Sequence, residues 1–467
     1  MLRLVPSGPA SFCAGDRQCS RPRSASPLEG TLLLRGGGAA AGAAAPLRTA
    51  RTGAPSAASA SASASASAPG SSLLPLLAST FLLMTAISIV SLSPTPILFD
   101  AYGPDRATSI LSTLAALAAA CEIVLSPILG AALDSVGRKP ALIASTLTVA
   151  AANAAASADP AALPVAAARF FSYVAIPQFF VASQAVAGDL YSSAPERMGA
   201  FLGLQGALIS AGFIGGVMAA GRLGEWRGTG AVYGLSSALA LGAGAGVTLG
   251  MGETLRGEDR TPFDLASTRS KVLRAPASAA RLLVSRGPRV RILALLLVLM
   301  SMPMFMGDVI QVYARKEWGL EPSALAPLIA VFGITNIVSM LAGSALIQRM
   351  GVKHFTGLAI LCGVIFPLSA TLSYKAALIG AVAGFMGSAQ SLGVKATLTA
   401  RVTDLGVKQG EFAGEKASLL AMVKIVCPLL YGVLYVLGSR AGIPQVLFLF
   451  NVLLAVLAMV LSQRDVW

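Results

Sequence analysis

Twelve long apolar segments follow one another along the chain, and they constrain its fold more than any other feature of the sequence. Each approaches the ~20 residues that an α-helix needs to cross ~30 Å of hydrocarbon. In lipid a helix satisfies its own backbone hydrogen bonds, so such segments become transmembrane helices. The sequence therefore predicts an all-α polytopic membrane protein with twelve transmembrane helices, at about 73–98, 107–131, 140–158, 163–188, 198–220, 229–250, 290–312, 323–346, 354–373, 376–399, 413–437 and 443–462.

The composition agrees with a membrane protein and argues against a nucleic-acid-binding one. Hydrophobic residues make up 55% of the chain and charged residues only 12%, whereas about a quarter of the residues are charged in soluble proteins. The net charge of +14 comes from basic residues in the first 71 positions and in the links between apolar segments. Basic links beside transmembrane segments are what orientation in a bilayer produces. We therefore expect a lipid bilayer and a small-molecule substrate as partners, no nucleic acid, and a monomer.

One long polar stretch divides the apolar segments into two sets of six. We predict an N-terminal six-helix bundle at 72–250, a basic linker at 251–289 and a C-terminal six-helix bundle at 290–467. The tail at 1–71 is rich in Ala, Ser and Arg and poor in large apolar residues, so we expect it to be disordered. Its composition is that of an organellar transit peptide. A cytosolic tail and an extension of the gene model are the alternatives.

The distribution of Lys and Arg predicts the side of the membrane on which the two termini lie. The links on the same side as both termini carry 17 Lys and Arg residues, nine of them between Arg256 and Arg291, and the opposite links carry seven. Links rich in positive charge stay on the cytoplasmic side. We therefore predict both termini on the cytoplasmic side, or on the stromal or matrix side if the membrane belongs to an organelle.

A charged motif that contains glycine, GAALDSVGRK at 130–139, separates the second and third apolar segments. Asp134 and Arg138 are four residues apart and can pair on one helix face, and the glycines allow a tight turn. Anchoring by positive charge together with a turn would explain the motif if it stood alone. A related stretch, SALIQRMGVK at 344–353, follows the eighth segment at the corresponding place. The repeat indicates an internal duplication of a six-segment unit.

The motif, its position and the six-plus-six organisation resemble the major facilitator superfamily over about residues 73–462. More narrowly, the chain resembles the twelve-span drug:proton antiporters of the tetracycline-efflux and hippocampus-abundant-transcript type. Three stretches carry this narrower resemblance: AGDLYSSAPERMGAFLGLQGA at 187–207, ETL at 253–255 and KQGEFAGEKASLLAMVKIVCPLLYG at 408–432. The resemblance implies two pseudo-symmetric six-helix bundles and secondary active transport by alternating access.

The resemblance also assigns a role to the charged motif. In the family, the aspartate of this loop faces the start of span 11, where the helix dipole favours an anion, and the arginine meets an acid at the end of span 4. Carried over, these residues are Asp134, Arg138 and Asp189. We expect a conformational latch that holds the two halves together on the cytoplasmic side, and its residues are Gly130, Asp134, Gly137, Arg138, Lys139 and Asp189.

Several charged residues lie inside the apolar segments, where each one costs at least ~2.5–3.5 kcal/mol and requires a partner or a function. Glu122 and Lys424 lie near the middle of their segments, whereas Arg169 and Asp308 lie nearer the ends. One hypothesis is a proton-titrating Glu122 with Lys424 as its counter-charge or as an anion-binding group; structural ion pairs are the other. The neutral candidates for the cavity are Gln178, Gln184, Asn336 and Gln390, of which Asn336 and Gln390 are assigned to the substrate or proton pathway; all four also suit helix–helix contacts.

The sequence departs from the antiporter pattern in two places. Thr85 occupies the position of the acid that these antiporters carry in span 1, and GFIGGVMAAG at 212–221 lacks the Gly-Pro pair of their span-5 motif. The small residues are retained, so Gly212 and Gly216 are expected to pack two helices closely. Either Glu122 replaces the missing acid, or the protein is a uniporter or a symporter.

The sequence thus predicts a secondary active transporter of a small solute, with proton-coupled efflux of drug-like or amphipathic compounds as the leading hypothesis. An organic anion or metabolite uniporter or symporter, and a non-transporting receptor or scaffold on the same fold, are the alternatives. No nucleotide-binding loop, metal-ligand cluster or Ser-His-Asp set is recognisable, and His354 is the single histidine. We therefore expect no enzymatic activity, no cofactor and no metal site.

Overall fold

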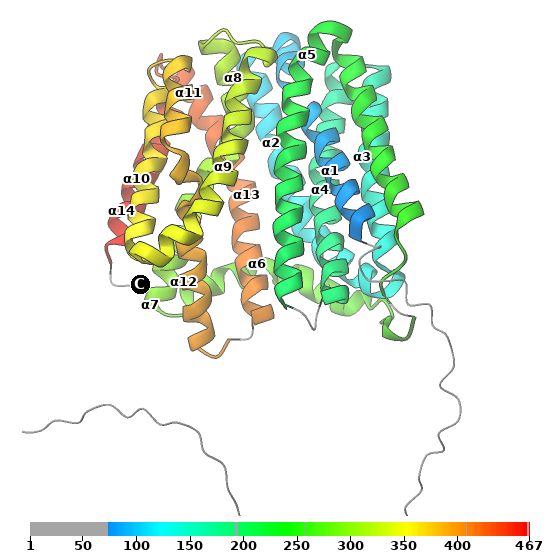
Figure 1. The fold of residues 1–467 in the computed structure, drawn as a ribbon. Helices are drawn as coiled ribbons and strands as arrows, with labels where there is room; N and C mark the ends of the chain where they lie inside the picture. Colours follow the sequence, from blue (N-terminus) through cyan, green and yellow to red (C-terminus); the bar gives the residue numbers. More distant parts are fainter. Residues whose placement is uncertain (1–72, 192–194, 256, 408, 465–466) are drawn as a thin grey trace, which may run out of the picture. The chain divides into compact units, whose positions relative to one another are not determined.

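The computed structural model describes residues 73–191, 195–255, 257–407, 409–464 and 467, so the predicted tail at 1–71 lies outside the described residues. Within them the chain forms α-helices joined by short turns and by three 3₁₀ segments (Figure 1). In chain order the elements are α1 (Leu73–Ile89), α2 (Pro94–Val136), α3 (Arg138–Ala158), α4 (Ala162–Tyr191), α5 (Pro195–Gly250), η1 (Gly257–Asp259), α6 (Leu265–Val284), α7 (Pro288–Ser301), η2 (Met302–Met306), α8 (Gly307–Glu317), α9 (Pro322–Met350), α10 (Val352–Ala370), α11 (Tyr374–Ala383), η3 (Phe385–Ala389), α12 (Gln390–Asp404), α13 (Gln409–Arg440) and α14 (Val446–Ser462).

Eight helical stretches of the described chain are long and apolar enough to cross a membrane, or nine if two helices that meet at a 61° bend near Gly384 form one span. Two of these stretches, Leu73–Val136 and Phe201–Gly250, have 64 and 50 residues, more than twice the ~20 that one crossing needs. Each contains a glycine with positive φ, Gly103 or Gly228, that interrupts the helix. The class of all-α polytopic membrane protein is confirmed, and twelve crossings remain the prediction.

The helices before and after α6 pack mainly among themselves, and three pairs of helices join the two sets. We call α1–α5 the N-terminal half and α7–α14 the C-terminal half. Across the halves α2 contacts α13 and α8, and α5 contacts α9 (Figure 1). By the predicted numbering, α2 and α13 are spans 2 and 11, whereas α5 begins with span 5 and α9 is span 8. Exchanging the two sets of six therefore exchanges the α2–α13 contact with the α5–α9 contact, as an internal duplication requires.

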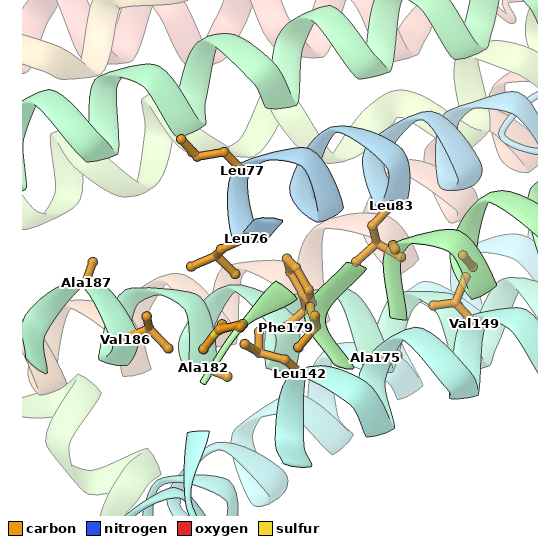
Figure 2. Close-up of a cluster of buried hydrophobic side chains, with 14 of the residues drawn as sticks. Leu76, Leu77, Leu83, Leu142, Val149, Ala175, Phe179, Ala182, Val186 and Ala187 are labelled. Atoms are coloured by element: carbon orange, nitrogen blue, oxygen red, sulfur yellow. The ribbon is translucent and has the colours of Figure 1, made fainter. Parts of the chain in front are cut away.

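A buried apolar cluster holds the N-terminal half together. Leu76 and Leu83 of α1, Leu142 of α3 and Phe179 of α4 are fully buried in it, and Figure 2 shows these side chains gathered between the three helices. Lipid tails are as apolar as these side chains, so the association of helices in a bilayer depends on close van der Waals packing and not on the hydrophobic effect. Small residues that let helices approach are therefore as important as the large ones.

Two glycines bring α5 close to α1. A Cβ atom on Gly212 would lie 2.8 Å from the carbonyl oxygen of Phe81, and one on Gly216 would lie 2.7 Å from that of Thr85. Between them, the hydroxyl of Ser88 donates a hydrogen bond of 3.1 Å to the carbonyl oxygen of Gly212. A larger residue at either position would force the two backbones apart.

The central linker, predicted only as a polar connection, contains the 20-residue helix α6. Asp264 caps this helix, because its side chain accepts a 2.9 Å hydrogen bond from the N–H of Ala266. Leu282 is buried and Leu273 is exposed, as one face of α6 packs on α13 and α2 while the other faces outward. The linker also reaches the turn between α2 and α3, where the N–H of Thr261 donates to the carbonyl oxygen of Asp134 at 2.9 Å. We call this end of the helices the linker end and the other the opposite end.

We expect Gly216→Ala to lower the melting temperature of the detergent-purified protein, because the added methyl group meets the backbone of α1. Overpacking of this kind costs about 1–3 kcal/mol. Gly215→Ala is the matched control, since a Cβ at this position meets no atom within 4 Å. Equal melting temperatures of the two variants would contradict the close approach of α1 and α5.

Candidate functional site

The turn between α2 and α3 is organised around the carboxylate of Glu253, which follows α5. Its two oxygens accept hydrogen bonds from the backbone N–H groups of Arg138 at 2.9 Å and Lys139 at 3.1 Å, the first residues of α3. The free N–H groups at a helix start and the helix dipole both favour an anion there. Gly137 has φ +123°, and a Cβ on it would lie 2.7 Å from Cδ of Glu253. Only glycine suits this position.

Arg138 connects the turn to the end of α4. Its guanidinium pairs with Asp134 at 2.9 Å and with Asp189 at 3.1 Å, and its side chain is 9% exposed. Asp189 also accepts a 3.1 Å hydrogen bond from the hydroxyl of Thr254. The carboxylate of Asp134 remains 55% exposed. The structure thus brings together the residues of the predicted latch from α2, α3 and α4, all of them in the N-terminal half.

The other two predicted latch residues make separate contacts. The ammonium group of Lys139 donates to the carbonyl oxygen of Thr248 at 2.8 Å and so joins α3 to the end of α5. A Cβ on Gly130 would meet no atom within 4 Å, so close packing in this conformation does not explain the glycine.

Glu253 was not among the predicted site residues, although the ETL stretch that contains it carried part of the family resemblance. Partial burial of the Glu253 carboxyl group raises its pKa, but hydrogen bonds from the backbone N–H groups of Arg138, Leu255, Lys139 and Thr254 outweigh burial. The net effect lowers the pKa of Glu253 below its usual value. This acid is therefore held ionised at the junction of α3 and α5.

A partly buried ion pair joins the two halves near the middle of the helices. The ammonium group of Lys424 on α13 lies 2.8 Å and 3.0 Å from the two carboxylate oxygens of Glu122 on α2. The side chains are 36% and 20% exposed, respectively. The two residues are 302 positions apart in the sequence, and both were predicted as members of the substrate or proton pathway.

A second ion pair joins the halves nearer the opposite end. Arg169 of α4 lies 2.6 Å from Asp308 of α8, and the two side chains are 10% and 13% exposed. The hydroxyl of Tyr173 donates to the other oxygen of Asp308 at 2.7 Å. The guanidinium of Arg169 also lies 4.4 Å from the centre of the Tyr173 ring, a cation–π contact.

Further polar contacts join the halves at the opposite end. Arg315 of α8 lies 3.0 Å from Asp100 of α2, and Arg440 of α13 lies 3.0 Å from Asp105 of α2. The hydroxyl of Thr95 donates a buried 3.0 Å hydrogen bond to the side-chain oxygen of Gln311. The halves are therefore bound together at the opposite end in this conformation.

A cavity of about 500 Å³ lies beside the central ion pair, towards the linker end. Glu122 and Lys424 line it together with parts of α4 and α5, namely Ile176, Pro177, Phe180, Val181, Gln184, Leu202, Gln205, Gly206 and Ile209. Its volume is within the range of small-molecule sites, about 300–1,000 Å³. The cavity combines a largely apolar wall with one acidic and one basic side chain.

Of the neutral candidates, Gln184 lines the cavity, whereas Asn336 and Gln390 lie elsewhere. The side-chain amide of Gln390 on α12 donates to the carbonyl oxygen of Met300 on α7 at 3.0 Å. Asn336 is an exposed residue of α9. Neither belongs to the described lining of the cavity, so the structure does not bring them together with Glu122.

The structure thus consists of two helical halves that ion pairs join, with a cavity lined by residues of both halves. Residues 76–414 match the family model described as Major Facilitator Superfamily, which covers well over half of the sequence. The chain belongs to the major facilitator superfamily. No curated protein matches the sequence.

Solved structures of transporters share the fold. The human organic anion transporter MFSD10 (TETRAN) is 15% identical with a TM-score of 0.60, and the similarity covers 85% of this chain and 99% of that one. The nucleoside transporter NupG is 13% identical with a TM-score of 0.62, covering 84% and 99%. A POT family transporter in complex with a thioalcohol conjugated peptide is 16% identical with a TM-score of 0.60, covering 83% and 94%. At these identities the similarity shows the fold alone, and the narrower antiporter group stays a prediction.

We expect Glu253→Ala to lower the melting temperature at neutral pH, by an amount typical of a lost helix cap, about 1 kcal/mol. Because the pKa of Glu253 is lowered in the folded state, its contribution is present above the unfolded-state pKa of ~4.3 and is lost as the pH falls through the folded-state value. The deficit of the variant should therefore shrink between pH 7 and pH 3 in a melting series. The control is Glu258→Ala, which changes an exposed acid of the same linker. A deficit of constant size over this range would exclude the charged cap.

Proposed function

We propose that this chain moves small amphipathic organic anions across the membrane by alternating access, together with protons. That it is a multi-pass secondary transporter follows from its family. The substrate class and the coupling rest on one observation, the Glu122–Lys424 ion pair that joins the halves and lines the cavity.

The positive charge in the cavity favours an anionic substrate. Lys424 is the single basic side chain in the described lining, and its 36% exposure leaves the ammonium group accessible from the cavity. A substrate carboxylate or other anion would compete with Glu122 for this group through a charge-assisted hydrogen bond. Ile176, Phe180 and Ile209 would contact the apolar part of the same molecule.

Charge balance couples the anion to a proton. The Glu122–Lys424 pair is neutral as a unit, so an added anion would leave a net negative charge in surroundings that solvate it poorly. Protonation of Glu122 removes that charge and releases Lys424 for the substrate. We infer that anion and proton bind together, which makes a symporter and gives Glu122 the role of the acid that is missing from span 1.

The human organic anion transporter with the same fold supports this substrate class only as an analogy, since it is 15% identical. The largely apolar wall of the cavity favours a second candidate, the export of neutral or cationic drug-like compounds in exchange for protons. In that case Glu122, and not Lys424, would be the group that the substrate binds.

The two ends of the molecule would close in turn. In this conformation polar contacts join the halves at the opposite end, and the cavity extends towards the linker end. We propose that Asp134, which is half exposed and held by Arg138, meets the start of α13 when the linker end closes. The N-terminus of a helix favours an anion, and α2 and α13 already pack on one another.

The proposed function predicts which compounds bind. Binding is measured as the thermal shift of the purified protein with a panel of organic anions, cations and neutral drugs. An anion at about 100 times its dissociation constant should stabilise the wild type by ~2.7 kcal/mol, and more strongly at lower pH because Glu122 takes up a proton. Lys424→Met should weaken binding about 10- to 100-fold, since a hydrogen bond to a charged group contributes about 1.5–3 kcal/mol. Glu122→Gln should still bind the anion, without the pH dependence.

Lys395→Met, which removes another lysine of the C-terminal half outside the described cavity lining, should leave binding unchanged. In proteoliposomes, uptake of the same anion should follow an imposed pH gradient for the wild type but not for Glu122→Gln. Binding that survives in Lys424→Met, or hits confined to neutral and cationic compounds, would overturn the anion assignment in favour of the drug-export candidate.

The second prediction concerns the latch. Asp134→Asn should favour the conformation described here, with the opposite end closed, because the linker end loses its anion. The measurement is labelling of Thr95→Cys, a buried position between the halves, by a membrane-impermeant maleimide in a background without other cysteines. Labelling should slow in the Asp134→Asn protein, whereas Asp159→Cys, in the exposed α3–α4 turn, should label equally in both. An unchanged rate at position 95 would remove Asp134 from the latch.

A further inference from the structure

A small cavity lies beside Arg169 and is distinct from the large cavity next to the central ion pair. Its volume is about 10 Å³, and it lies inside the N-terminal half. Five polar side chains line it. Tyr173 donates its hydroxyl to Asp308, and the other four are Asn153 of α3, Arg169 and Ser172 of α4 and Tyr233 of α5. Ile87, Val90 and Pro94 close it on the side of α1 and the start of α2.

Each of these four side chains has a buried polar atom without a hydrogen-bond partner among the described residues. The atoms are Nε of Arg169, Oγ of Ser172, the hydroxyl oxygen of Tyr233 and Oδ1 of Asn153. Ser172, Tyr233 and Asn153 are 3%, 1% and 0% exposed, and the side chain of Arg169 is 10% exposed. Unsatisfied buried groups are rare and costly, so four around one cavity point to a ligand between them.

The hydrogen-bond donors and acceptors around the cavity restrict the kind of ligand that can bind there. Nδ2 of Asn153 donates to the hydroxyl of Ser236 at 2.9 Å, and this hydroxyl donates in turn to the carbonyl oxygen of Ala86. The amide orientation is thereby fixed, which leaves Oδ1 of Asn153 as an acceptor in the cavity. Nε of Arg169 is a donor only, and the two hydroxyl groups can act either way.

We propose that this cavity binds one water molecule. Water accepts from Nε of Arg169 and from one hydroxyl, and it donates to Oδ1 of Asn153 and to the other hydroxyl. A halide ion would accept from the donors but would be repelled by Oδ1 of Asn153. The volume lies at the lower end of the ~10–15 Å³ that one buried water needs, and such a water usually makes about three hydrogen bonds.

The water gives Arg169 a second set of partners, which matters if the halves separate at the opposite end as proposed above. Asp308 belongs to the C-terminal half and would then leave Arg169. A buried charge that loses its partner is strongly destabilising. The water, Ser172, Tyr233, Asn153 and the Tyr173 ring all belong to the N-terminal half and stay with the guanidinium. The hydrated cavity therefore keeps Arg169 solvated in both conformations.

The direct test is an experimental structure of the full chain at a resolution that shows ordered water, determined in chloride and again in bromide. We expect density for one water within about 3 Å of Nε of Arg169, the same in both salts. An empty cavity between side chains in these positions would overturn the proposal. Anomalous scattering from bromide at the site would overturn the choice of water.

A double-mutant cycle on melting temperature tests the solvation of Arg169 without any substrate. Tyr233→Phe and Ser172→Ala each remove one hydroxyl from the cavity, and both should lower the melting temperature more in an Asp308→Asn background than in the wild type. Ser145→Ala is the control, because this hydroxyl donates within its own helix to Ala141, and its effect should be equal in the two backgrounds. Equal effects of the cavity variants would overturn the solvation role. Since no transport is measured, that failure would leave the proposed function untouched.

Discussion

Two ion pairs inside the apolar segments join the two halves, and the arrangement of the molecule depends on them. Glu122 of α2 pairs with Lys424 of α13, and Arg169 of α4 pairs with Asp308 of α8. Hydrocarbon cannot solvate an isolated charge, and it supplies no hydrophobic force that would press the halves together. The two ion pairs therefore both stabilise the contact and restrict it to conformations in which each charge is compensated.

The α2–α13 and α5–α9 contacts between the halves are related by the internal duplication, yet the chemistry on the two sides differs. On the α2 side they include ion pairs with α8 and α13. On the α5 side, α9 approaches through glycines: a Cβ on Gly221 would lie 2.7 Å from Cα of Ser323, and one on Gly333 would lie 2.7 Å from Cγ1 of Ile214. Protons and anions can alter an ion pair but not a steric contact. The side of α2, where the charged end of the cavity lies, is therefore the side on which charges join the halves.

Much of the fold could be predicted from the sequence because a bilayer imposes a simple length rule on apolar segments. The same rule could not predict α6, because this helix is amphipathic and follows a polar stretch. Charges inside apolar segments marked Glu122, Arg169, Asp308 and Lys424 as unusual, but pairing between positions 302 residues apart depends on how the helices pack. Glu253 was not predicted as a site residue because it lies outside these segments. Its partners are backbone N–H groups, which almost every residue has and which therefore leave no mark in the sequence. Asn336 and Gln390 do not line the cavity, because a polar residue of a helix can equally face a neighbouring helix or the outer surface.

The position of two charges on α4 explains why the ends of the molecule would not close at the same time. Arg169 holds the contact with Asp308 near the opposite end, and Asp189 holds Arg138 at the linker end. Twenty residues of helix separate them, which is about 30 Å. α4 packs on α2 and α3 in the same half, so a rotation that brings one end of this half towards the C-terminal half carries the other end away from it. When a rigid half with charged groups at both ends rotates, it therefore loses contacts with the C-terminal half at one end and can form them at the other. In that scheme the proposed water beside Arg169 solvates the guanidinium when Asp308 moves away at the opposite end. Asp134 is already exposed to solvent at the linker end and needs no buried water.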